Sequence, residues 1–119
     1  MGEPTLFHNP RCSKSRGAKA LLDDAGVDYE IVEYLKTPPT RAELERLVSI
    51  LDDPPEALVR TGEPAFKELG VDKATLTEAS AVVDLLADHP ALMERPVLIV
   101  GDRAVIGRPP ERVQDILAG

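Results

Sequence analysis

The residues with the clearest chemical potential lie in segment 8–16, HNPRCSKSR, which contains the only cysteine of this 119-residue chain, Cys12. An apolar run at 5–7 predicts a strand before this segment, and apolar residues at helical spacing from Ala18 onward predict a helix after it. Cys12 is therefore expected between the end of a strand and the first turn of a helix. Unpaired N–H groups and a partial positive charge at that end of a helix favour thiolate over thiol.

The side chains around Cys12 could reinforce this effect, since His8, Arg11, Lys14 and Arg16 can all carry positive charge. In such surroundings the pKa of a cysteine falls from about 8.5 to between roughly 3.5 and 7.5, and the thiolate is the nucleophilic form. The sequence therefore predicts a reactive nucleophile at Cys12, supported by a protonated His8. The alternatives are a buried cysteine that acts as a small apolar residue and a neutral His8 packed beside the strand end.

Three arginines far apart in the sequence, Arg60, Arg95 and Arg108, each stand at a predicted element boundary close to proline or glycine. Side chains at such boundaries can converge on a site, and the planar guanidinium group binds oxyanions through several hydrogen bonds. Each arginine taken alone is more typical of a solvated surface charge. Spacing does not show whether the three converge, so an oxyanion site beside Cys12 depends on the fold.

The middle of the chain is predicted to be helical. A second strand is expected at 29–34, after which residues 38–90 contain helical patterns and no strand candidate. One of these helices begins with a capping box formed by Thr40 and Glu43, and a longer one is predicted to begin at Thr77. We therefore interpret 38–90 as a helical insertion between two halves of a sheet.

The C-terminal part returns to β-structure. A buried strand is predicted at 97–100, a return strand at 104–106, and a last helix with a proline at or near its first position. The order β-α-β, helices, β-β-α is similar to the thioredoxin-type α/β arrangement, with a central mixed sheet of about four strands. We expect one domain over 1–119. In thioredoxin-like folds a cis-proline faces the reactive cysteine, and this similarity implies a cis bond before Pro96.

Composition excludes several classes of function. The net charge of −7 disfavours binding to nucleic acid or to an anionic membrane, and two Tyr, two Phe and no Trp offer few platforms for stacking bases. No apolar run is long enough to span a membrane, and no signal segment is recognisable. A single cysteine fits a reducing compartment, so a cytoplasmic location is expected. One cysteine and two separated histidines do not predict a metal site.

The sequence resembles the glutaredoxin-coupled arsenate reductase (ArsC) family of thioredoxin-like proteins, in register from about Thr5 to Leu117. The resemblance is carried by residues 8–16, Tyr34-Leu35, Pro38-Pro39-Thr40-Arg41, Leu58-Val59-Arg60, Glu63-Pro64, His89-Pro90, Arg95-Pro96 and Gly107-Arg108-Pro109. It implies that Cys12 is the catalytic cysteine, that His8 helps to lower its pKa, and that Arg60, Arg95 and Arg108 bind the oxyanion.

The implied reaction is attack of the Cys12 thiolate on arsenate, followed by reduction to arsenite. Ser15 stands where a Cys-x-x-Cys protein has its second cysteine, so electrons must come from an external thiol, which in this family is glutathione followed by glutaredoxin; no bound cofactor is expected. Two alternatives remain open. One is a glutathione-dependent thiol reductase. The other is a non-catalytic Spx-like regulator that binds RNA polymerase, although Ser15 removes the cysteine pair that such regulators use to sense oxidation.

Overall fold

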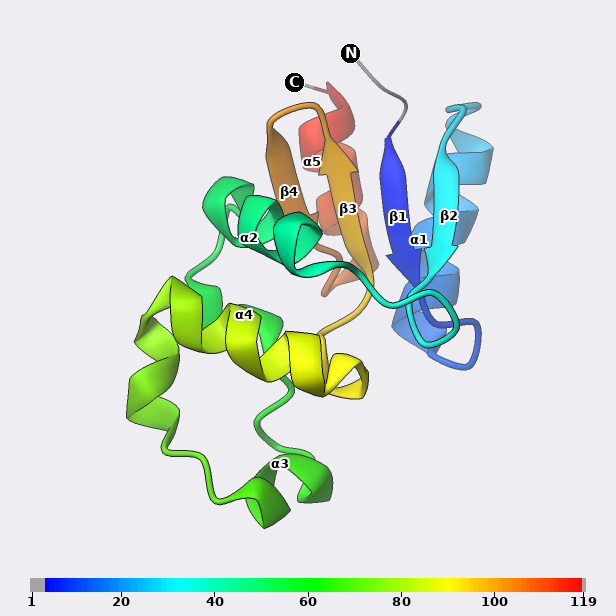
Figure 1. Cartoon of the computed structure of the whole chain (residues 1–119). Coiled ribbons are helices and arrows are strands. Elements are labelled where there is room, and N and C mark those ends of the chain that lie inside the picture. The colour runs from blue at the N-terminus through cyan, green and yellow to red at the C-terminus, as the bar shows by residue number, and fades with distance from the viewer. Residues whose placement is uncertain (1–3, 119) are drawn as a thin grey trace.

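In the computed structural model of the protein, residues 4–118 are described and form a small α/β fold (Figure 1). The strands are β1 (Thr5–His8), β2 (Glu30–Glu33), β3 (Val97–Val100) and β4 (Arg103–Ile106). The α-helices are α1 (Ser13–Asp24), α2 (Arg41–Ile50), α3 (Pro64–Leu69), α4 (Ala79–Asp88) and α5 (Val113–Ala118). Short 3₁₀ helices are η1 (Pro55–Leu58), η2 (Lys73–Thr77), η3 (Pro90–Leu92) and η4 (Pro110–Arg112).

The four strands form one mixed sheet in the order β2-β1-β3-β4. β1 pairs in parallel with β2 and antiparallel with β3, and β3 pairs antiparallel with β4. In the β1–β3 register Leu6 lies opposite Leu98 and Phe7 lies opposite Val97. Since successive side chains of a strand point to opposite faces, Leu6 and Leu98 enter one core and Phe7 and Val97 enter the other. The predicted mixed sheet of about four strands is confirmed.

Helices cover both faces of this sheet (Figure 1). α1 and α5 pack on one face, around a core made of Leu6, Ala18, Leu22, Leu98, Val105, Val113 and Ile116. α2 and α4 pack against each other on the opposite face, over the larger core. Figure 1 shows α3 farther from the sheet than α2 and α4. Between β2 and β3, the described residues form helices and contribute only isolated β-bridges.

Local sequence signals account for most element boundaries. The side chain of Thr40 accepts a hydrogen bond from the Glu43 backbone N–H, and the Glu43 carboxylate accepts one from Thr40, which confirms the predicted capping box. The prediction that a helix begins at Thr77 is wrong. Asp72 caps a 3₁₀ turn that ends at Thr77, and Glu78 then adopts an extended conformation, so α4 begins at Ala79.

Candidate active site

Cys12 is the N-cap residue of α1, directly after a turn in which its backbone N–H donates to the carbonyl oxygen of Asn9 at 3.0 Å. Its own carbonyl oxygen accepts the first helical hydrogen bond, from Arg16. The backbone is extended, with φ −94° and ψ 124°. The thiol thus lies at the N-terminal end of the helix, where the backbone N–H groups of Ser15 and Lys14 lower its pKa.

The pKa of the Cys12 thiol is lowered overall. Burial is the largest single influence and by itself raises the pKa, but four smaller interactions that favour the thiolate together outweigh it. They are the N–H group of Ser15, the positive charge of Arg95, the N–H group of Lys14 and the guanidinium of Arg108. The helix end and the two arginines therefore raise the fraction of Cys12 that is ionised at a given pH below its pKa.

Arg95 and Arg108 approach each other on two neighbouring segments. An Nη1–H group of Arg108 lies 4.0 Å from Sγ of Cys12 and donates to the Arg95 carbonyl oxygen at 3.1 Å. The Arg95–Pro96 bond is cis, as predicted, and the Arg108–Pro109 bond is cis as well, which the sequence did not indicate. The close approach of the Arg108 segment to Pro96 requires glycine at position 107, because a Cβ atom there would lie 2.8 Å from Cγ of Pro96.

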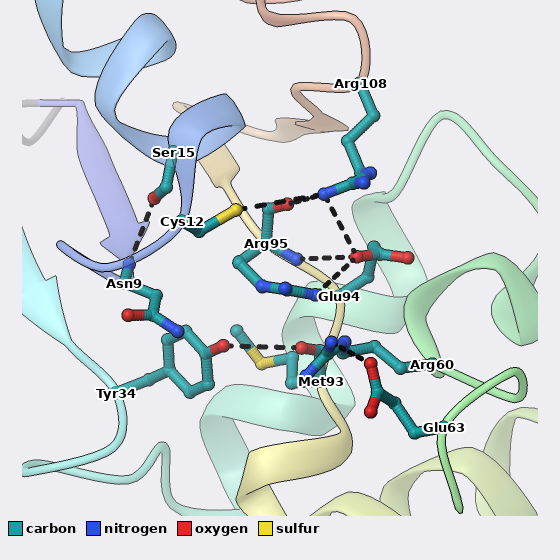
Figure 2. A network of polar contacts seen from close by, with 10 residues as sticks. All are labelled: Asn9, Cys12, Ser15, Tyr34, Arg60, Glu63, Met93, Glu94, Arg95 and Arg108. Atoms are coloured by element: carbon teal, nitrogen blue, oxygen red, sulfur yellow. Dashed lines mark hydrogen bonds and ion pairs between the residues drawn. The ribbon is translucent and has the colours of Figure 1, made fainter.

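Arg60 reaches the same place from the helical segment. Its backbone N–H donates to the carbonyl oxygen of Leu92 at 2.8 Å. The preceding residue, Val59, forms a β-bridge with Met93, which lies two residues before Arg95. The three arginines line one cavity of about 290 Å³ together with Val59, Thr61, Gly62, Glu63 and Glu94. The three arginines singled out in the sequence are thus brought together, and Arg108 joins their cavity to the sulfur (Figure 2).

Two carboxylates that the sequence reasoning missed lie among these arginines (Figure 2). Glu63 pairs with Arg60. One oxygen of Glu94 lies 3.3 Å from Nη1 of Arg95 and 3.6 Å from Nη1 of Arg108. Three guanidinium groups therefore face two carboxylates and one thiolate, so the site carries no net charge when Cys12 is ionised. The sequence signal that could have indicated Glu94 is its position directly before Arg95.

Comparison with known proteins agrees with this geometry. The profile of the ArsC family matches residues 7–116. The chain belongs to the ArsC family. An arsenate reductase of Neisseria meningitidis is 42% identical over 118 residues, which cover 98% of this chain and all of that protein. The Escherichia coli protein YfgD, named as uncharacterized, is 43% identical over 94% of each chain. An arsenate reductase structure from Vibrio cholerae has a TM-score of 0.86 at 38% identity, covering 95% of this chain and 96% of that one, and establishes the thioredoxin-like fold.

His8 of this ArsC-family chain differs from the expectation of a charged group beside the sulfur. It is buried at the end of β1, and its Nδ1 lies 2.7 Å from the hydroxyl oxygen of Ser15. Burial lowers the pKa of His8 and so favours the neutral imidazole. The Ser15 hydroxyl also accepts from the Asn9 backbone N–H at 3.0 Å. His8 thus supports the loop before Cys12, while the positive charges at the thiolate belong to Arg95 and Arg108.

Tyr34 is a further residue of the site to which the sequence reasoning gave no role. It is 1% exposed, and its hydroxyl donates to the Met93 carbonyl oxygen at 3.5 Å. Burial raises the pKa of Tyr34, and the nearby charges of Arg95 and Arg60 only partly oppose this effect. Figure 2 shows its ring between the Asn9 loop and the Met93 segment, so it packs between the elements that carry the cysteine and the arginines.

The part of the chain that the structure describes contains no cluster of three or more His, Cys, Asp or Glu residues able to hold a metal ion. Over residues 4–118, no helix is both long and apolar enough to cross a bilayer.

Proposed function

We propose that this protein is an arsenate reductase in which Cys12 is the nucleophile and an external thiol supplies the electrons. The observation that carries the proposal is the approach of Arg108 to within 4.0 Å of the sulfur, at the edge of a cavity lined by three arginines. A related protein of N. meningitidis is named arsenate reductase, which supports arsenate as the substrate.

Arg60, Arg95 and Arg108 would hold the tetrahedral oxyanion and offset its repulsion from the thiolate. Sγ of Cys12 then forms a bond to arsenic while the bond from arsenic to a hydroxyl group breaks, and the departing hydroxide takes one proton from solvent and leaves as water. A glutathione thiolate next attacks Sγ, so that an S–S bond forms and the electron pair of the S–As bond stays on arsenic, which becomes arsenite. Glutaredoxin reduces the mixed disulfide and restores the Cys12 thiol.

The need for an external thiol follows from the residue at the resolving position. Ser15 occupies the place of the second cysteine in a Cys-x-x-Cys pair, and no other cysteine exists in the chain. The Ser15 hydroxyl is fully buried and bonded to His8, so its role is in packing of the loop. Dependence on glutathione and glutaredoxin fits a reducing compartment, and we therefore place the reaction in the cytoplasm.

The test is arsenate-dependent consumption of NADPH in the presence of glutathione, glutaredoxin and glutathione reductase. The wild-type protein should support turnover, Cys12→Ser should abolish it, and Arg95→Lys should raise KM because one ammonium cannot replace the planar fork of donors. Arg46→Gln is the matched control. Arg46 donates to the Gly101 carbonyl oxygen at the tip of the β3–β4 hairpin, outside the arginine cavity, and its replacement should leave turnover unchanged.

A second assay replaces arsenate with hydroxyethyl disulfide. Turnover of the disulfide without any turnover of arsenate would refute the proposal in favour of a glutathione-dependent thiol reductase. Arsenate reduction by Cys12→Ser at the wild-type rate would remove the nucleophile assignment, even if the overall activity is correct.

A further inference from the structure

The carboxylate of Glu94 lies inside the group of arginines that the proposed function assigns to the oxyanion. Its Oε1 lies 3.3 Å from Nη1 of Arg95 and 3.6 Å from Nη1 of Arg108, and it also accepts from the backbone N–H of Arg95 at 3.2 Å. The side chain is 21% exposed, so solvent screens it only in part. A negative charge is thus fixed between the two guanidinium groups nearest to Cys12.

This arrangement has a consequence for any anion that binds there. Each guanidinium has five N–H donors, so Arg95 and Arg108 can hold Glu94 and an oxyanion at the same time. The oxyanion then lies against a carboxylate, which when ionised can only accept hydrogen bonds. An oxyanion with a hydroxyl group can donate to Glu94, whereas a fully deprotonated one places two acceptors and two negative charges face to face.

We propose that Glu94 is a specificity-determining residue that selects oxyanions carrying a proton. Arsenate and phosphate retain at least one hydroxyl group near neutral pH, whereas sulfate has none. The site would therefore accept arsenate and phosphate and reject sulfate, although all three are tetrahedral. This inference rests on the oxyanion site of the proposed function and adds to it the feature of the anion that is recognised.

Glu63 is the natural comparison within the same cavity. It pairs with Arg60, three residues earlier in the chain, and not with the two arginines beside the sulfur. The variants Glu94→Gln and Glu63→Gln each remove one negative charge from the cavity lining and keep the size of the side chain. A difference in anion selectivity between the two variants is therefore due to the position of Glu94 and not to the net charge of the cavity.

The experiment measures how inorganic phosphate and sodium sulfate protect Cys12 from iodoacetamide, at constant ionic strength and at a mildly alkaline pH where phosphate is mainly a dianion. Because Cys12 is the only thiol, alkylation reports this site alone. Neither anion is reduced, so the readout does not depend on turnover. In the wild-type protein, half-protection by sulfate should need at least a roughly tenfold higher concentration than half-protection by phosphate, the effect of one charge-assisted hydrogen bond.

In Glu94→Gln the two concentrations should become similar, mainly because sulfate binds more tightly, while Glu63→Gln should keep the wild-type ratio. Equal protection by phosphate and sulfate in the wild-type protein would overturn the role of Glu94 and leave the oxyanion site intact. An equal loss of selectivity in both variants would also overturn it. If phosphate gives the wild-type protein no protection at all, the oxyanion site of the proposed function fails, and this inference fails with it.

Discussion

The replacement Gly107→Ala tests how the two arginine-bearing segments are brought together. A Cβ atom at this position would lie 2.8 Å from Cγ of Pro96 and 3.3 Å from Cγ1 of Val113. Ordinary contact begins near 3.4 Å, so the β3 and β4 ends must separate by about 0.6 Å at the proline. Cγ of Pro96 belongs to a ring that is tied to the backbone and cannot rotate away.

This displacement should affect both the free energy of unfolding and the affinity for phosphate. Overpacking of this kind destabilises the fold by about 1–3 kcal/mol, and the reduced entropy of the unfolded chain stabilises it by about 0.4–1 kcal/mol. The free energy of unfolding should therefore fall by up to about 2.6 kcal/mol. Arg108 directly follows Gly107, and its Nη1 lies 4.0 Å from the sulfur. Because a misplacement of about 1 Å can cost a hundredfold, we expect half-protection of Cys12 to need about three- to tenfold more phosphate.

Urea denaturation gives the free energy of unfolding, and alkylation of Cys12 in the presence of phosphate gives the affinity. The matched control is Gly62→Ala, which lies in the lining of the same cavity but would place its Cβ in open space, with nothing within 4 Å. It should leave phosphate protection unchanged and keep or slightly raise stability. If Gly107→Ala behaves like Gly62→Ala in both measurements, the close approach of Gly107 to Pro96 does not position Arg108.

Two further predictions concern the thiol and the loop before it. Arg108→Gln removes a partly exposed positive charge beside the sulfur, which weakens stabilisation of the Cys12 thiolate by about 1 kcal/mol. The pH profile of Cys12 alkylation should therefore move to higher pH, and the rate below its midpoint should fall about fivefold. Arg46→Gln should leave the profile unchanged. An unshifted profile would mean that the helix end alone activates the thiol. Ser15→Ala leaves His8 Nδ1 without its buried partner and should lower the free energy of unfolding by about 1–3 kcal/mol in urea, while its backbone N–H still stabilises the thiolate. A change in alkylation with unchanged stability would contradict this division of roles.

Much of the fold was predictable because its signals are local. The capping box at Thr40, the apolar run at 97–100 and the polar segment before α1 each act over a few residues, and the structure confirms each element. The start of α4 was missed because the turn before it is set by the Asp72 side chain, whose bond to the Ala74 backbone competes with a continuous helix.

The sequence predicted most of the residues that meet at the candidate site, but it did not predict which charges surround the thiol. Residue type and the family resemblance pointed to Cys12 and the three arginines. The sequence predicted a protonated His8, whereas burial in the folded chain lowers its pKa, and burial cannot be read from the residue type. Glu94 was missed because a glutamate beside an arginine in sequence has no fixed geometry until the backbone is folded.

The sequence by itself determined that one thiol lies at the start of a helix, since the turn residues and the helical periodicity that place it are neighbours along the chain. Only the tertiary structure decided what surrounds that thiol. Arg60, Arg95 and Arg108 come from three segments, and their convergence depends on the β1–β3 pairing, the Val59–Met93 bridge and the space left at Gly107. Long-range contacts of this kind leave no periodic pattern in a sequence, because they arise from packing of surfaces that are distant along the chain.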